Sequence, residues 1–131
     1  MARYFTPEEA NAALPQVRPL AERMVTLRRR LLEAQAREER LAAKVAGNGG
    51  GIDLAEAAKA AAGVERAMRA LAESIDAIVA LGVQVKDLDT GLLDFPSLRD
   101  GEEVLLCWRL GEEQVAWWHR PEDGFAGRQP L

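Results

Sequence analysis

The stretch GNGGGID, residues 47–53, separates two long helical patterns and decides the fold of the chain. Glycine adopts left-handed backbone conformations without a steric cost, so a run of glycines ends a helix and lets the chain reverse. Asp53 is a favourable N-cap for the helix that follows. A short connection of this kind, a turn over residues 47–52, predicts two helices that lie side by side and antiparallel.

The segment before this turn carries a narrow apolar stripe at heptad spacing. Thr6 and Glu9 form a capping box, so we expect the first helix to cover residues 6–46. Two internal prolines remove backbone donors, which predicts a kink or a break near residues 11–15. The predicted stripe consists of Val17, Leu20, Met24, Leu27, Leu31, Ala34, Leu41 and Val45.

A second heptad follows the turn and predicts a helix over residues 53–82. Alanines on its other faces would allow a further helix to approach closely, so we expect a homodimer in which two hairpins form a four-helix assembly. The alternative is that alanine serves only as a good helix former. The predicted stripe consists of Leu54, Ala57, Ala61, Val64, Met68, Leu71, Ile75 and Ile78.

Beyond this helix the apolar period changes from 3.6 to 2, which predicts a small antiparallel β-meander over residues 83–120 and a tail over residues 121–131. The Asp-Gly pair at residues 100–101 is a favourable two-residue hairpin turn, and it pairs Asp94 with Cys107. The fold class is therefore α+β, mainly α, with a long coiled-coil-like helical hairpin followed by the meander. We expect residues 1–131 to form a single domain.

A second turn, at residues 112–113, would pair Leu106 with His119 and Cys107 with Trp118. Since alternate residues of a strand face opposite ways, this register separates Cys107 from His119 and disfavours a nucleophilic Cys-His pair. It also puts Asp94 on the Cys107 side, unless a bulge at Pro96 turns it toward His119.

Charge and composition exclude several classes of function. The net charge is -4, and residues 83–131 hold 5 basic against 10 acidic side chains, which disfavours nucleic-acid binding there. No apolar run approaches the ~20 residues needed to span a bilayer, and no secretory leader is recognisable, so we expect no membrane association and a cytoplasmic location. A single cysteine, Cys107, forms no internal disulfide.

The chain's only histidine and several carboxylates suggest a metal site. Asp94, Glu112 and His119, with Asp89 as a further candidate, would offer one nitrogen and several oxygen ligands for a divalent ion such as zinc, manganese or iron. A hydrogen-bonded structural histidine is the alternative. The DLDTGLLD stretch, residues 87–94, does not match a calcium-loop template, and a polar turn explains it better.

Two further residues are candidate ligand-binding groups. Trp118 would form an aromatic wall of the site. Arg128 follows a glycine-rich tail that would let its guanidinium reach a bound anion or a carboxylate. A structural salt bridge from Arg128 to Asp94 or Glu112 is the alternative.

The order of several short motifs resembles the bacterial domain-of-unknown-function family 2203. The opening FTPEEANAALP is similar to the start of that family, so the likeness covers nearly the whole chain. It implies a small cytoplasmic protein with a helical front and signature residues gathered at the back, and it carries no activity with it. The matching residues are Gly91-Leu92, Asp94-Phe95, Leu106-Cys107-Trp108, Gly111-Glu112, Trp118-His119, Gly124, Gly127 and Arg128.

Three functional hypotheses follow. The first is a dimeric protein whose meander carries a polar metal- or small-ligand-binding site. The second is a non-catalytic interaction module in which the helical surface docks a partner and the tryptophans and histidine are structural. The third is a hydrolytic enzyme, which would need a metal with an open position to supply its nucleophile.

Overall fold

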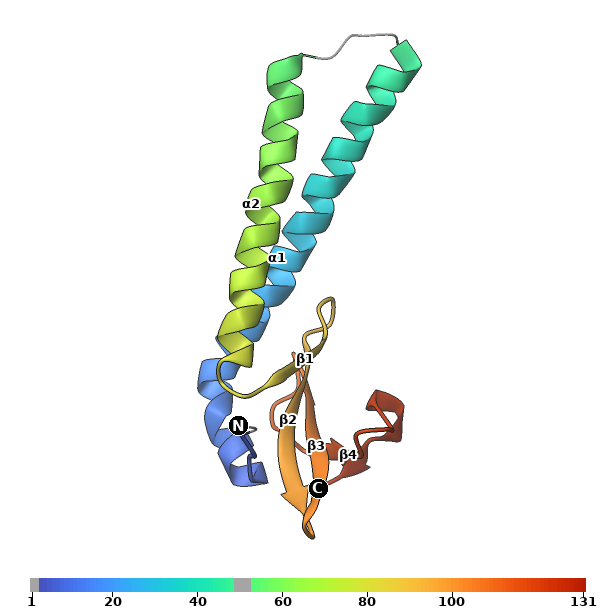
Figure 1. Ribbon diagram of the computed structural model, residues 1–131. Helices are drawn as coiled ribbons and strands as arrows, with labels where there is room; N and C mark the ends of the chain where they lie inside the picture. Colours follow the sequence, from blue (N-terminus) through green and yellow to red (C-terminus); the bar gives the residue numbers. More distant parts are fainter. Residues whose placement is uncertain (1–2, 49–52) are drawn as a thin grey trace. The chain divides into compact units, whose positions relative to one another are not determined.

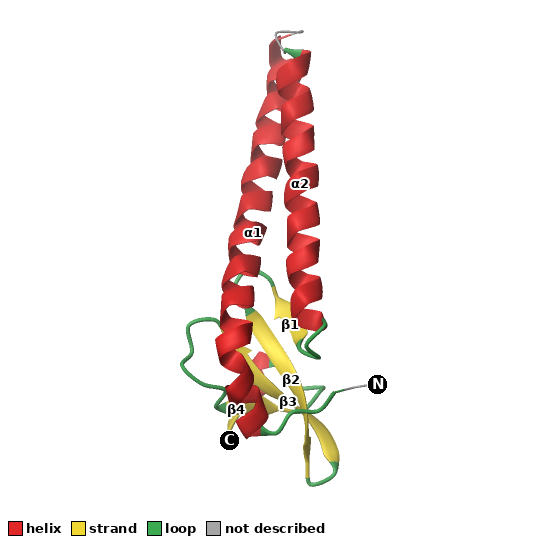
Figure 2. Ribbon diagram, turned by 90° about the vertical axis from the view of Figure 1, so that its left-hand side faces the viewer, coloured by secondary structure: helices red, strands yellow, loops and turns green. Residues whose placement is uncertain are grey.

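The computed structural model describes residues 3–48 and 53–131. In these residues two helices precede a five-stranded antiparallel sheet with the strand order β1-β2-β3-β4-β5 (Figures 1 and 2). The predicted α+β class is confirmed, and most of the glycine-rich turn lies outside the described residues. The elements are α1 (Pro7–Asn48), α2 (Leu54–Val79), β1 (Gln84–Asp87), β2 (Leu92–Arg99), β3 (Glu102–Arg109), β4 (Trp117–His119), the 3-10 turn η1 (Phe125–Gly127) and β5 (Gln129–Pro130).

Contacts divide the chain into two compact units. The first unit combines the residues up to Val25 with Ser74–Leu131, and it therefore contains the start of α1, the end of α2 and the sheet. The second unit is Thr26–Glu73, in which the remaining parts of the two helices run antiparallel. The polar residues of interest all belong to the first unit.

The start of α1 forms as the sequence predicts. The backbone N–H of Glu9 donates to Thr6 Oγ1 at 3.0 Å, and the backbone N–H of Thr6 donates to Glu9 Oε1 at 2.9 Å, which completes the capping box. These bonds to Thr6 lower the pKa of Glu9. The break expected near residues 11–15 is absent, because α1 continues through Pro15 and Pro19. Both prolines are exposed, so burial of the opposite helix face outweighs their cost of ~3 kcal/mol each.

The buried stripe of α2 differs in phase from the predicted one. Leu71 and Ile78 are buried as expected, but Leu54 is 84% exposed and Met68 53% exposed, so these two predicted core positions are wrong. The buried line instead takes in Ala60. Alanine occurs on neighbouring faces of α2, and hydrophobicity alone therefore did not select the correct line.

In the first unit, one face of the sheet packs on the helices. The rings of Phe5 and Phe95 meet edge to face at 5.2 Å, and the backbone N–H of Phe5 donates to the carbonyl of Pro96 at 2.7 Å. Long-range contacts of this kind attach the start of the chain to β2. The core of this unit comprises Phe5, Leu14, Val17, Met24, Ile78, Val83, Leu93, Phe95, Val104, Leu106 and Trp108.

Candidate metal centre

Strands β2 and β3 form a regular hairpin that brings Asp94 opposite Cys107. The turn lies at Asp100 and Gly101, whose φ angles are 52° and 81°, as a type I′ turn requires. The predicted pairing of Asp94 with Cys107 is confirmed, and the ladder continues through Pro96, which pairs with Leu105 without a bulge. Residues opposite each other share a face of the sheet, so Asp94 and Cys107 lie on the same side.

The pairing of β3 with β4 corrects the predicted register by one residue. His119 pairs with Leu105 and Trp118 with Leu106, whereas the sequence suggested Leu106 and Cys107 as their partners. A slip of one residue moves every side chain of a strand to the other face. His119 therefore lies on the same face as Cys107, and the prediction that a β-hairpin separates them is wrong.

The connection from β3 to β4 explains this register. It is a seven-residue loop rather than a two-residue turn, because β3 ends at Arg109 and β4 begins at Trp117. Asn11 of α1 holds the loop: its Nδ2 donates to the carbonyl of Val115 at 3.1 Å, and its Oδ1 accepts from the N–H of Val115 at 2.7 Å. Trp108 Nε1 donates to the carbonyl of Glu112 at 3.0 Å.

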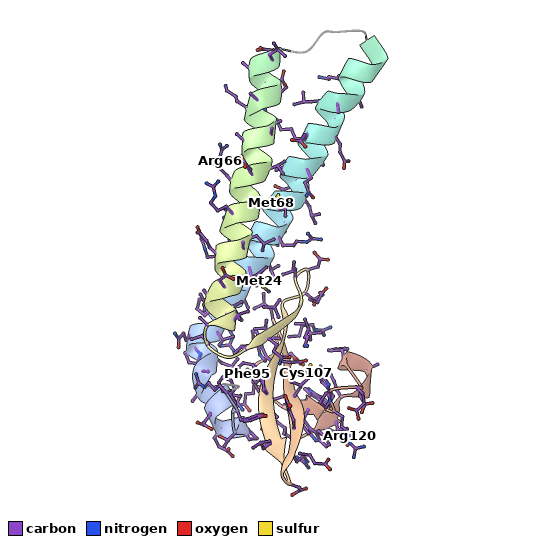
Figure 3. All side chains as sticks on the ribbon, viewed as in Figure 1. Met24, Arg66, Met68, Phe95, Cys107 and Arg120 are labelled. Atoms are coloured by element: carbon purple, nitrogen blue, oxygen red, sulfur yellow. The ribbon has the colours of Figure 1, made fainter. Side chains whose placement is uncertain are left out.

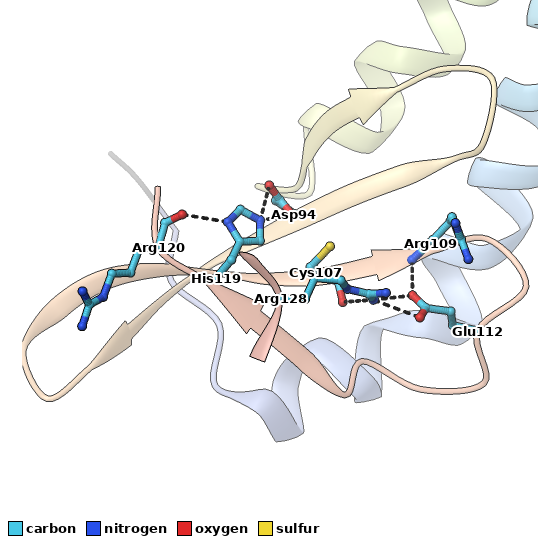
Figure 4. Close-up of polar contacts among 7 residues, drawn as sticks. All are labelled: Asp94, Cys107, Arg109, Glu112, His119, Arg120 and Arg128. Carbon is cyan, nitrogen blue, oxygen red and sulfur yellow. Dashed lines mark hydrogen bonds and ion pairs between the residues drawn. The ribbon is translucent and has the colours of Figure 1, made fainter. Parts of the chain in front are cut away.

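The resulting group consists of Asp94, Cys107 and His119, and all three residues are buried (Figure 4). One potential ligand atom from each residue lies within 4.8 Å of the others. Asp94 is 2% exposed, Cys107 0% and His119 3%. Burial of polar groups is costly unless each finds a partner, so the contacts of this group decide what it can do.

His119 is oriented through both ring nitrogens. Nδ1 lies 2.8 Å from the carbonyl oxygen of Arg120. Because a carbonyl only accepts hydrogen bonds, Nδ1 carries a proton, and Nε2 then has either a lone pair in the neutral ring or a second N–H in the protonated ring. Nε2 lies 3.2 Å from each carboxylate oxygen of Asp94. A lone pair that faces a carboxylate is repelled unless a proton or a metal cation lies between them.

Cys107 completes the group from the central strand. Burial, together with the nearby negative charge of Asp94 and hydrogen bonding to its carboxylate, raises the pKa of the Cys107 thiol to about 12, despite the opposing effect of Arg128. The thiol is therefore neutral at pH 7 in the protein without metal. A bound divalent cation would reverse this balance, because a metal displaces the proton of a coordinating thiol.

The separation of the His119 and Asp94 ligand atoms suits a first-row metal ion. Two ligands at ~2.0 Å from a tetrahedral zinc ion lie ~3.3 Å apart. The distance from His119 Nε2 to the Asp94 oxygens, 3.2 Å, is close to that edge. A backbone carbonyl that fixes the other ring nitrogen of a histidine is also the usual support of a histidine ligand. The mixed nitrogen, oxygen and sulfur set fits zinc better than manganese, which prefers oxygen ligands.

Glu112, a predicted ligand, is engaged elsewhere. Its carboxylate accepts Arg128 Nη2 at 2.7 and 2.9 Å and the backbone N–H of Arg109 at 2.6 Å. The Arg128 guanidinium also lies over the rings of Trp117 and Phe125, at 5.1 and 4.5 Å from their centres. The structure therefore contains the salt bridge from Arg128 to Glu112 that was the structural alternative for Arg128.

The remaining candidates lie apart from this group. Trp118 pairs with Leu106 and so occupies the opposite sheet face, where the Arg99 guanidinium stacks 4.4 Å from its ring centre. Asp89 belongs to the turn between β1 and β2. The sequence predicted that Cys107 pairs with Asp94, but it did not indicate that Cys107 joins Asp94 and His119 in one group.

Fold and site together define an α+β protein in which a helical pair precedes a meander with a buried Asp-Cys-His group. The chain matches the model of DUF2203, described as an uncharacterized conserved protein, over residues 3–131, and it belongs to this family. No curated protein and no solved structure matches the chain. In residues 3–48 and 53–131, neither helix is long and apolar enough to cross a membrane.

Proposed function

We propose that this protein binds one divalent transition-metal ion, preferably zinc, through Asp94, Cys107 and His119. The observation that supports this most is the position of His119 Nε2, 3.2 Å from both oxygens of a buried carboxylate, while Nδ1 is held by the carbonyl of Arg120. A metal ion between them would be bound by the nitrogen and by the carboxylate in two coordinate bonds. Cys107 thus replaces Glu112 in the ligand set predicted from the sequence.

The direct test is elemental analysis of protein purified without an affinity tag or added metal, followed by titration of metal-free protein with zinc. We expect one zinc ion per chain. At a free zinc concentration 100 times Kd, binding contributes about 2.7 kcal/mol of stability, which raises Tm by roughly 10 °C for a chain of this size. Absence of metal, together with an unchanged Tm on adding zinc, iron(II) or manganese, overturns the proposal.

Variants identify the ligand set. In cobalt-substituted protein, a thiolate ligand produces a sulfur-to-metal charge-transfer band, which Cys107→Ser should abolish. His119→Gln and Asp94→Asn should weaken metal binding by at least tenfold. Glu112→Gln is the matched control, because it neutralises a nearby carboxylate outside the group and should leave the cobalt spectrum unchanged. If Glu112→Gln weakens metal binding and Cys107→Ser does not, the ligands are Asp94, Glu112 and His119, as the sequence predicted.

The alternative for this group is a buried ion pair between protonated His119 and Asp94 without metal. Circular dichroism of each variant shows whether it still folds. If the protein takes up no metal on titration and Asp94→Asn only lowers Tm, the Asp94, Cys107 and His119 group is structural. That result would favour the interaction-module hypothesis.

We also propose that the chain forms a homodimer through α2. A second apolar line at spacings of four and three runs along the exposed side of this helix. Met68 and Val79 are each 53% exposed. One polar residue, Glu65, interrupts the line. Its members are Leu54, Ala58, Ala61, Met68, Ala72, Ile75 and Val79.

An antiparallel second copy fits this line. Such a pairing, centred between residues 66 and 67, places Leu54 against Val79 of the other copy. It also places Glu65 beside Arg69 of the other copy, and symmetry repeats this ion pair. The only charge in the line is thereby compensated.

Light scattering should give twice the chain mass of 14.3 kDa at micromolar concentration. Met68 is labelled on α2 in Figure 3. Met68→Glu should dissociate the dimer, because it places two carboxylates next to Glu65, one from each copy. Ala77→Glu is the control, since it adds the same charge at an exposed position outside the line. A wild-type protein of 14.3 kDa contradicts the dimer.

A cytoplasmic location remains part of this proposal. A reducing compartment, in which cysteines stay unoxidised, favours a metal site with a thiol ligand.

A further inference from the structure

A cavity of about 150 Å³ adjoins the Asp94–His119 pair, and both residues form part of its wall. At about 30 Å³ per water molecule, this space holds roughly five waters. It is well below the ~300 Å³ at which sites for drug-sized ligands begin. A ligand in this cavity is therefore limited to a few non-hydrogen atoms.

The cavity walls are apolar apart from Lys86 and the buried pair. The apolar part consists of side chains from β2 and β3 and of the segment that follows His119. Phe125 in that segment is held by the guanidinium groups of Arg109 and Arg128, at 5.2 and 4.5 Å from its ring centre. The remaining wall residues are Leu92, Leu105, Pro121, Gly124 and Phe125.

A β-bulge explains why Lys86 reaches this cavity. In the ladder of β1 with β2, Val85 pairs with Leu93 and Asp87 with Leu92, so Lys86 is an extra residue without a partner in the ladder. Bulges redirect side chains, often beside functional sites. Here the bulge falls at Lys86, the one cationic residue of a cavity wall that Asp94 and His119 also line.

The charges select the kind of ligand. A divalent ion bound by the carboxylate of Asp94, the thiolate of Cys107 and neutral His119 forms a group with no net charge. Lys86 adds one positive charge, which a single monoanion would neutralise. Three protein ligands also leave the fourth position of a tetrahedral zinc ion open.

We infer that the open position of the metal binds a small aliphatic carboxylate, whose oxygen coordinates the ion, whose charge is countered by Lys86, and whose short chain lies against Leu92 and Phe125. This inference rests on the proposed metal site. A carboxylate is favoured over phosphate because the wall offers one cation and an apolar surface, whereas a dianion needs several donors.

The test uses cobalt-substituted protein titrated with propionate, followed by the visible absorption of the metal. We expect a saturable spectral change. Lys86→Met should weaken propionate binding about tenfold and leave the affinity for cobalt unchanged. Lys59→Met is the matched control, because Lys59 is an exposed lysine on α2 and its loss should change neither affinity.

A second variant tests the cavity itself. Leu92→Phe partly fills the space, so it should abolish the response to propionate while cobalt still binds. If cobalt binds and propionate changes nothing, or if Lys86→Met binds propionate as the wild type does, this inference is wrong and the metal site stands. If cobalt does not bind at all, both proposals fail.

Discussion

Arg128 should stabilise the meander mainly through one salt bridge and two aromatic contacts, and replacement by alanine should cost about 2.5 kcal/mol. The salt bridge to Glu112 is partly buried, with side-chain exposures of 12% and 22%, so we expect it to contribute about 1.5 kcal/mol, above the value of an exposed pair. Stacking on Trp117 and Phe125 should add about 0.5 kcal/mol per ring.

Urea unfolding followed by circular dichroism separates these contributions. Arg128→Lys keeps the charge and loses the stacking, so it should cost about 1 kcal/mol. A double-mutant cycle of Arg128→Ala with Glu112→Gln should give a coupling energy of about 1.5 kcal/mol. Arg109→Ala is the control, because it removes a guanidinium that lies over the Phe125 ring, 5.2 Å from the ring centre, and leaves the salt bridge of Arg128 in place.

Two results would refute this reasoning. A coupling energy below about 0.5 kcal/mol would mean that the ion pair behaves as if fully exposed. Equal losses for the lysine and alanine variants would mean that the positive charge contributes nothing.

Two other predictions concern stability. In metal-free protein, the Cys107 thiol is protonated in both the folded and the unfolded chain well below pH 9. Between pH 9 and about 12 the thiol of the unfolded chain ionises first, so the free energy of unfolding should fall by about 2 kcal/mol at pH 11. Urea titrations at pH 8 and pH 11 should show that Cys107→Ala removes this part of the pH dependence. An equal loss of free energy of unfolding in the wild type and the variant would contradict the prediction. Gly91→Ala should lower Tm more than Gly101→Ala: both positions have positive φ, but a Cβ at Gly91 lies 2.9 Å from Leu110 Cβ, whereas no described atom lies within 4 Å at Gly101. Equal losses of Tm would show that backbone strain alone sets the cost.

The sequence predicted those features that depend on local chemistry. The capping box at Thr6 and the turn at Asp100-Gly101 are each specified within a few residues, and both form as expected. The register of β2 with β3 follows from that turn. The opposition of Asp94 and Cys107 could therefore be predicted before the structure was known.

The features that the sequence did not predict depend on distant contacts. The register of β4 depends on Asn11, which bonds to Val115 across 104 residues of chain. No local pattern indicates this contact, and the assumption of a two-residue turn put His119 on the wrong face. On α2, two neighbouring lines are both apolar, so the choice between them required knowledge of what the helix packs against.

The three residues of the buried group also share a topological property. Asp94 and His119 are only 25 residues apart along the chain, and β2, β3 and β4 are neighbours both in sequence and in the sheet. Short loops cost little entropy to close, so these strands can pair early in folding. The bonds of Asn11 to the loop before β4 require a much longer closure. The group would therefore assemble as the meander forms, and docking of α1 would then fix the strand that carries His119.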